Sequence, residues 1–318
     1  MGKLAIMFPG QGTQSVGMAL DIITAHPEAE EIFHTASRAV DKDLLKLTME
    51  GPAEKLNLTE NTQPCLFATE MAIYQTIINA GIQADAFLGF SLGEWAAVTA
   101  AGVIPVDVAS SLVQTRATAM QAAVPVGRGS MAVILGKTKE EVVQLCESAE
   151  GYVVPSNFNC PGQISVSGSV EGIESLLTLA QGRNIIAKRI EVSIPSHCGL
   201  MQPAAEKLRE LVCSIPFQLP VKPVIMNCCA EAVTDPSEIK KNVIQQLTSP
   251  VLMEASIFYL LSEGFDTFVE AGPGKTMSGF VKKCAKANNI PVQTYSVNSE
   301  KALEDTIKLI CGGCQRVE

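Results

Sequence analysis

The sequence predicts an α/β protein in which a small subdomain is inserted into a larger one, and three observations support this. Short apolar and β-branched runs alternate with helix-like segments along most of the 318 residues. The chain is 47% apolar and 18% charged, which is typical of a globular protein with one large domain or a domain plus a subdomain. No internal repeat or low-complexity linker interrupts this pattern.

The predicted strands are short runs bounded by helix-like segments, glycine or proline. They cover residues 4–8, 86–90, 131–135, 152–157, 164–168, 185–192, 224–227, 267–270 and 293–297. Because helices separate most of these strands along the chain, we expect a largely parallel sheet.

The middle of the chain has an order of its own. The strand at 131–135 is followed by the helix-like "KEEVVQLCESA", two strands joined by the turn "CPGQ", the helix-like "VEGIESLLTLAQ" and a last strand. This β-α-β-β-α-β order is typical of a ferredoxin-like unit. We therefore predict a small subdomain at 126–194 and a large α/β subdomain formed by 1–125 and 195–318. A groove between the two is the expected ligand site.

Composition and charge exclude several classes of partner. The net charge of −9 is a poor match for nucleic acid or an anionic membrane surface. The longest apolar stretch, from Trp95 to Ala109, is interrupted by Pro105 and Asp107, so no membrane span is expected. The chain begins with "MGKLAIMFPGQG", which fits a first strand better than a secretory signal, and its ten cysteines are therefore expected to be free thiols in the cytoplasm.

The segment "GFSLG" fits the nucleophile elbow G-x-S-x-G, with Ser91 between Gly89 and Gly93. A sharp turn from strand to helix strains the serine backbone, and side chains at the two glycine positions are expected to collide with it. The turn places the Ser91 hydroxyl at a helix N-terminus, where the Leu92 N–H can stabilise an oxyanion. The alternative interpretation is a glycine turn with a capping serine.

A catalytic serine needs a base, and the chain has three histidines. His26 precedes Pro27 at an expected helix start, and His34 lies on a charged helix, so both are expected to be structural or solvated. His197, in "SIPSHCGLM", follows a strand and is the best-placed candidate base. The acids between 91 and 197 lie mostly on the helices of the inserted subdomain, so the standard triad acid is not found.

Three further segments do not support a cofactor or metal site. "GQGTQSVG" has Ser15 in place of the third glycine of a dinucleotide fingerprint, and "GPGKTMSG" lacks the first P-loop glycine because position 269 is valine. "CGGC", from Cys311 to Cys314, could form a redox or metal pair, but no second C-x-x-C exists and no strand precedes it.

Six segments in register resemble the malonyl-CoA:acyl-carrier-protein transacylases of fatty-acid synthesis and the related acyltransferases of polyketide assembly. They extend over about residues 4–297 and are "FPGQGTQSVGM", "GFSLGEWAA", "TRATAMQAAVPVGRGSMAVILG", "NFNCPGQISVSG", "VSIPSHCGLM" and "EAGPGKTMSGF". The resemblance implies a hydrolase-like large subdomain with a parallel sheet plus a ferredoxin-like small subdomain.

The resemblance also implies a role for individual residues. Ser91 would be the nucleophile, His197 its base, and the Gln246 carbonyl would replace the triad acid. The Gln11 and Leu92 N–H groups would bind the oxyanion. Arg116 would hold the free carboxylate of the acyl group. The remaining substrate-binding positions would be Met120, Met131, Ser196 and Asn159.

The family usually has histidine before the nucleophile, whereas this chain has Phe90, a difference that bears on substrate fit or rate rather than on the type of reaction.

The implied reaction moves a malonyl group from malonyl-CoA to the phosphopantetheine thiol of an acyl carrier protein through a malonyl-serine ester, with no metal or nucleotide cofactor. A lysine cluster at 275, 282, 283 and 286, with Lys188 and Arg189, is a candidate docking surface for that carrier, and a solvated helix face is the alternative. Other readings are transfer of another acyl group, hydrolysis of an acyl thioester, and a non-catalytic carrier-binding module. Arg116 argues against a simple hydrolase, and the intact Ser91 and His197 argue against the non-catalytic module.

Overall fold

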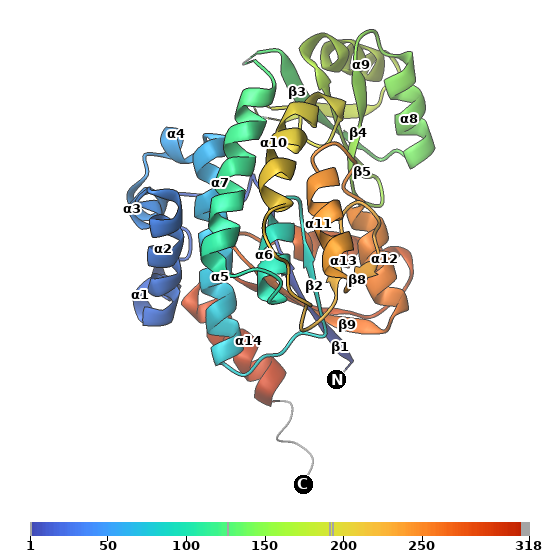
Figure 1. Ribbon diagram of the computed structural model, residues 1–318. Helices are drawn as coiled ribbons and strands as arrows, with labels where there is room; N and C mark the ends of the chain where they lie inside the picture. Colours follow the sequence, from blue (N-terminus) through green and yellow to red (C-terminus); the bar gives the residue numbers. More distant parts are fainter. Residues whose placement is uncertain (1, 126, 191, 193, 313–318) are drawn as a thin grey trace.

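The computed structural model describes residues 2–125, 127–190, 192 and 194–312 and contains two separate β-sheets (Figure 1). The larger sheet has six strands in the order β10-β9-β1-β2-β7-β8, and all neighbours are parallel except the pair β7–β8. Its strands are β1 (Lys3–Phe8), β2 (Ala86–Gly89), β7 (Val224–Ile225), β8 (Ala232–Val233), β9 (Phe265–Ala271) and β10 (Gln293–Val297).

Helices cover both faces of this sheet. In β1, Leu4, Ile6 and Phe8 belong to one buried cluster, whereas Ala5 and Met7 belong to another. Because side chains alternate along a strand, these clusters lie on opposite faces. The first face is covered by helices that include α5 (Thr59–Asn79), α6 (Gly93–Ala100), α7 (Val106–Ala123) and α10 (Gln202–Val212). The second is covered by α12 (Met253–Ser262) and α13 (Thr276–Ala287).

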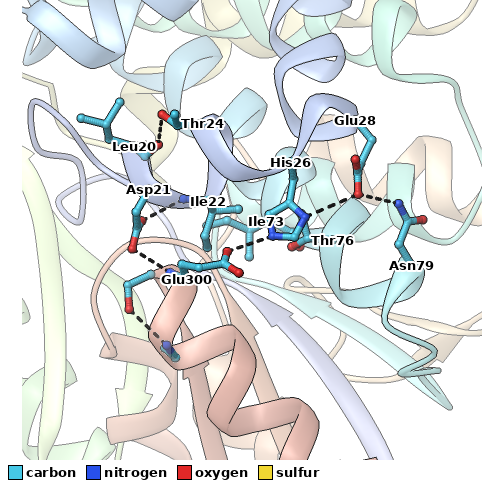
Figure 2. A network of polar contacts seen from close by, with 12 residues as sticks. Leu20, Asp21, Ile22, Thr24, His26, Glu28, Ile73, Thr76, Asn79 and Glu300 are labelled. Atoms are coloured by element: carbon cyan, nitrogen blue, oxygen red, sulfur yellow. Dashed lines mark hydrogen bonds and ion pairs between the residues drawn. The ribbon is translucent and has the colours of Figure 1, made fainter.

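The outer helices extend the first layer. They are α1 (Leu20–Ala25), α2 (Pro27–Val40), α3 (Leu44–Glu50), α4 (Ala53–Leu56), α11 (Pro236–Gln245) and α14 (Glu300–Cys311), and a 3-10 turn spans Gly199–Met201. The C-terminal helix α14 is joined to the α1–α2 corner by a polar network around His26 and Glu300 (Figure 2). None of the described helices is both long and apolar enough to span a membrane.

The second sheet has four antiparallel strands in the order β4-β5-β3-β6. It consists of β3 (Gly129–Leu135), β4 (Val153–Cys160), β5 (Gln163–Ser169) and β6 (Ile186–Ile190), with α8 (Lys139–Ser148) and α9 (Val170–Gly182) packed on it (Figure 1). The chain order β3-α8-β4-β5-α9-β6 confirms the predicted ferredoxin-like pattern. The subdomain boundaries stay a prediction, and positions 126, 191 and 193 beside them lie outside the described residues.

A short segment after α11 joins the two sheets. The Val251 N–H donates to the Ser156 carbonyl of β4 at 2.9 Å, and the Val251 carbonyl accepts from the Phe158 N–H at 2.9 Å. The next residue, Leu252, donates its N–H to the Asn227 carbonyl at 2.9 Å. Residues 251–252 therefore link the small sheet to the loop that follows β7, beside the C-terminal ends of the parallel strands.

Candidate active site

Ser91 lies at the turn between β2 and α6, and its backbone has φ 57°. This left-handed conformation is strained for a residue with a side chain, as expected of a nucleophile elbow. A Cβ on Gly89 would lie 2.0 Å from the Gly93 carbonyl, and a Cβ on Gly93 would lie 2.2 Å from the Phe8 carbonyl. The glycines are required as predicted. A side chain on Gly89 would collide with Gly93, and one on Gly93 with the end of strand β1, rather than with the serine backbone.

Ser91, His197 and Gln246 form a continuous chain of hydrogen bonds. His197 Nε2 is 2.7 Å from Ser91 Oγ, and His197 Nδ1 is 2.8 Å from the Gln246 carbonyl oxygen. A carbonyl oxygen can only accept, so the imidazole proton is on Nδ1 and the lone pair of Nε2 points at the serine hydroxyl. Gln246 therefore contacts the imidazole where a triad would have a carboxylate.

Burial and a neighbouring cation keep the imidazole neutral. His197 is 2% exposed, and its backbone also adopts a positive φ of 60°. Loss of solvation and the charge of Arg116 lower the pKa of His197 to about 4, against a smaller opposing effect of the Gln246 carbonyl. At neutral pH the ring is therefore a free base.

Arg116 is a buried cation on α7 with 1% exposure. Its Nη2 donates to Ser91 Oγ at 3.1 Å and to Gln246 Oε1 at 2.8 Å, while Nη1 donates to Gln63 Oε1 at 2.6 Å. Burial lowers the pKa of Arg116 to about 10, and the nearby Glu94 opposes that shift. The guanidinium thus stays charged at neutral pH, with its fork held beside the serine oxygen.

These side chains open into a cavity of about 160 Å³ between the two sheets. Nine of the ten residues proposed for the site line it, while Gln246 lies behind His197. The lining includes Gln11, Ser91, Leu92, Arg116, Met120, Met131, Asn159, Ser196 and His197. Met131 and Asn159 come from the small sheet and the others from the larger part of the fold or the segment after β6, so the cavity occupies the expected groove.

Phe90 also lines the cavity, and its ring packs edge-to-face on Phe280 of α13 at a centroid distance of 5.9 Å. The position before the nucleophile is therefore part of an apolar wall. Phenylalanine offers no hydrogen bond there, so the polar contacts of Ser91 come from other residues.

Three polar residues that the sequence analysis did not single out complete the site. Asn227 Oδ1 accepts the Ser91 N–H at 2.8 Å, and Asn227 Nδ2 donates to the Gly89 carbonyl at 2.6 Å. Gln63 of α5 contacts Arg116 and, at 3.5 Å, the sulfur of Met120. Glu94, in the first turn of α6, is fully buried. The sequence signal for Glu94 was that it is a single carboxylate within the apolar stretch "EWAAVTAAG".

Comparison with known proteins identifies the family. A family model described as "Acyl transferase domain" matches residues 6–306. The malonyl CoA-acyl carrier protein transacylase of Bacillus subtilis is 40% identical over 316 residues, which cover 98% of each chain. The crystal structure of malonyl CoA-acyl carrier protein transacylase from Clostridium perfringens superposes with a TM-score of 0.93 at 35% identity, covering 98% of each chain.

A second similar structure contains a type II polyketide-synthase acyl-carrier protein in complex with its malonyl-transacylase. It has a TM-score of 0.92 and 34% identity, and it covers 96% of this chain and 99% of the matched one. Sequence, fold and coverage agree along nearly the whole length. This chain belongs to the acyltransferase family and, within it, to the malonyl CoA-acyl carrier protein transacylases.

Proposed function

We propose that this protein transfers a malonyl group from malonyl-CoA to the phosphopantetheine thiol of an acyl carrier protein, for fatty-acid or polyketide synthesis. The observation that carries the proposal is one cavity that contains a serine–histidine pair in contact at 2.7 Å and a buried arginine within 3.1 Å of the same serine oxygen. The first can form an acyl ester, and the second can recognise a carboxylate on the acyl group.

In the first half-reaction Ser91 Oγ attacks the thioester carbonyl while its proton passes to His197 Nε2. The C–S bond then breaks, and the departing CoA sulfur takes the proton from His197, which leaves a malonyl-serine ester and free CoA. The Leu92 and Gln11 N–H groups are the proposed oxyanion donors, because both residues line the cavity beside Ser91. The carrier thiol reverses the steps and removes the malonyl group.

Arg116 is the proposed selector for malonyl. An acyl group on Ser91 Oγ would extend from the atom that Nη2 already contacts, so its free carboxylate can meet the guanidinium fork. The malonyl carboxylate would also offset the positive charge of Arg116, which lowers the pKa of His197. Malonyl binding would thereby strengthen the base as well as fix the substrate.

The carrier protein is proposed to dock over α13. Phe280 of this helix lines the cavity, while Lys282, Lys283 and Lys286 are exposed, and Lys283 Nζ donates to Gln163 Oε1 of β5 at 3.0 Å. The lysines therefore lie near the junction of the two sheets, where an acidic partner could reach the cavity. Rising salt is expected to raise the KM for the carrier protein if these lysines attract it.

The test is intact-protein mass spectrometry after mixing with malonyl-CoA. We expect one malonyl adduct on the wild type and none on Ser91→Ala with an unchanged circular dichroism spectrum. An adduct that persists in Ser91→Ala would assign the chemistry to another nucleophile. Release of malonate with no transfer to added carrier protein would instead identify a hydrolase using the same serine.

The cytoplasm is the proposed location. All nine cysteines in the described part of the chain are free thiols, and most are buried; Cys314, the last residue of "CGGC", lies outside the described residues. Free thiols are typical of proteins from a reducing compartment.

A further inference from the structure

Glu94 is a fully buried carboxylate in the first turn of α6, the helix that follows the nucleophile. Its Oε1 accepts the Asn227 N–H at 2.5 Å, and its Oε2 accepts from Gln246 Nε2 at 2.6 Å. Neither contact involves substrate or the reacting atoms. Both partners, however, hold the reacting residues directly.

Asn227 and Gln246 surround the elbow from two sides. Asn227 binds the Ser91 N–H and the Gly89 carbonyl. Gln246 Nε2 also donates to the Ser91 carbonyl at 2.8 Å, and the Gln246 backbone carbonyl accepts from His197 Nδ1. One carboxylate thus fixes the two residues that orient the nucleophile and its base.

The direction of each hydrogen bond requires a group that only accepts at position 94. Arg116 is a donor only, so Gln246 must present Oε1 to it and Nε2 to Glu94. The second partner, the Asn227 backbone N–H, is also a donor only. If Gln246 flipped, its amide nitrogen would face the arginine and its oxygen would face the Ser91 carbonyl. Ionised glutamate satisfies both donors, whereas glutamine at 94 would turn an N–H toward one of them.

We propose that Glu94 is a positioning residue that holds Ser91 and His197 in register through Asn227 and Gln246, an inference that rests on the proposed function. In Glu94→Gln one short hydrogen bond becomes a contact between two donors, and the elbow or the imidazole shifts. Displacements of about 1 Å in an active site cost roughly 100-fold in rate. We therefore expect kcat for malonyl transfer to fall about 100-fold with little change in KM.

Glu70 of α5 provides a matched control. It is also fully buried, but no described residue donates a hydrogen bond to either of its carboxylate oxygens, and it does not line the cavity. Glu70→Gln is therefore expected to keep the wild-type kcat. Equal loss of kcat in folded Glu70→Gln and Glu94→Gln would overturn the proposal, because removal of any buried acid would then be sufficient.

The main readout is the rate at which a fluorophosphonate probe labels Ser91, which needs the serine–histidine pair but neither malonyl-CoA nor carrier protein. A wild type that forms no malonyl adduct defeats the proposed function, whereas the labelling rates of the wild type, Glu94→Gln and Glu70→Gln still test Glu94. The proposal is supported if Glu94→Gln is labelled slowly while Glu70→Gln is labelled at the wild-type rate. Labelling of Glu94→Gln at the wild-type rate overturns it.

The pH profile of labelling separates positioning from packing. The charged or titratable groups that face Glu94 are Arg116 from α7, and Cys228 and Cys229 from the loop after β7. Burial raises the pKa of Glu94 to about 7, so wild-type labelling should decline as pH falls through that value. Glu94→Gln should lack this step, and a step retained in the variant contradicts the proposal.

Asn227→Ala carries the test if Glu94→Gln does not fold. It removes the amide that transmits the position of Glu94 to the Ser91 N–H, while the backbone N–H that Glu94 binds remains. We expect slower labelling with a normal KM for malonyl-CoA. An unchanged labelling rate in folded Asn227→Ala overturns the proposal.

Discussion

Two polar networks built around histidines differ in almost every physical respect. His197 is buried, lies beside a cation and donates Nδ1–H to a backbone carbonyl. His26 lies between two carboxylates, with Nε2 2.9 Å from Glu300 and Nδ1 3.6 Å from Glu28, and all three side chains are partly exposed (Figure 2). The same side chain is thus held as a neutral base in one place and set among anions in the other.

The difference shows how replaceable each partner is. Water can take the place of any lost partner around His26, because the side chains there are 26–36% exposed. In the network of Ser91, Glu94, Arg116 and His197, a lost partner leaves a buried donor or acceptor unpaired, which costs about 1–3 kcal/mol or more. We therefore expect changes in the buried network to affect chemistry strongly, and changes around His26 to affect stability weakly.

The largest expected effect is that of His197→Ala. Without the base, Ser91 keeps its proton, and acylation by malonyl-CoA should slow by roughly 10⁴-fold. Single-turnover mass spectrometry measures the rate. His34→Ala, which changes an exposed histidine of α2, is the control and should acylate as the wild type does. Rapid acylation of His197→Ala would show that the 2.7 Å contact is not the catalytic one.

Arg116→Ala should have the next largest effect, on selectivity. Loss of a charge-assisted pair with the malonyl carboxylate should lower the ratio of kcat/KM for malonyl-CoA to that for acetyl-CoA by about 30- to several-thousand-fold. The ratio is the appropriate measurement, because Arg116 also contacts Ser91 and Gln246 and both substrates share that loss. Arg38→Ala, at an exposed arginine, is the control. An unchanged ratio would remove Arg116 as the selector.

The strands and much of the site could be predicted from sequence because their signals are local. Apolar and β-branched runs marked β1 and β9, and the spacing of Gly89, Ser91 and Gly93 marked the elbow. Strand β8 was missed, since Ala232–Val233 is too short for any periodicity and is defined only by pairing with β7. The positions of Met131 and Asn159 on the cavity wall followed from the family resemblance rather than from local pattern.

The part of the site formed by Gln63, Glu94 and Asn227 could not be predicted, because its contacts join distant parts of the chain. Asn227 is 136 residues from Ser91, and Gln246 is 152 residues from Glu94. Local pattern cannot show that a carboxylate in an apolar helix will meet two donors. Gln63 has the same difficulty, because it becomes a site residue only when α5 packs against α7 and Arg116 reaches it.

The buried base should also make the free energy of unfolding depend on pH, an effect smaller than the changes in rate and selectivity. The folded pKa of His197, about 4, lies below its ordinary value of 6.5, so the unfolded chain binds more protons between these values. The stability that depends on neutral His197 is therefore full above about pH 6.5 and is lost as pH falls through about 4. Between pH 6.5 and 4, the free energy of unfolding of the wild type should fall by about 3 kcal/mol relative to that of His197→Ala. Urea unfolding at several pH values measures the difference.

Glu94 should make the free energy of unfolding change with pH in the opposite direction. Burial raises its folded pKa from 4.5 to about 7, so the folded state binds more protons between these values. The free energy of unfolding of the wild type, relative to that of Glu94→Gln, should fall as pH rises from 4.5 to 7. Slopes of the same sign for both variants would contradict this account of the buried network.

The smallest expected effect is that of His26→Ala. Its contact with Glu300 joins the α1–α2 corner to α14, but the Glu300 N–H keeps its hydrogen bond to Asp21 Oδ2 at 2.7 Å (Figure 2). A partly exposed polar contact of this kind contributes about 0.2–1 kcal/mol, and salt screens any charge on it. We therefore expect a loss of that size at low salt, faster hydrogen exchange confined to α14, and unchanged malonyl transfer. A loss of activity in His26→Ala would contradict this independence, because it would couple the peripheral network to the buried one.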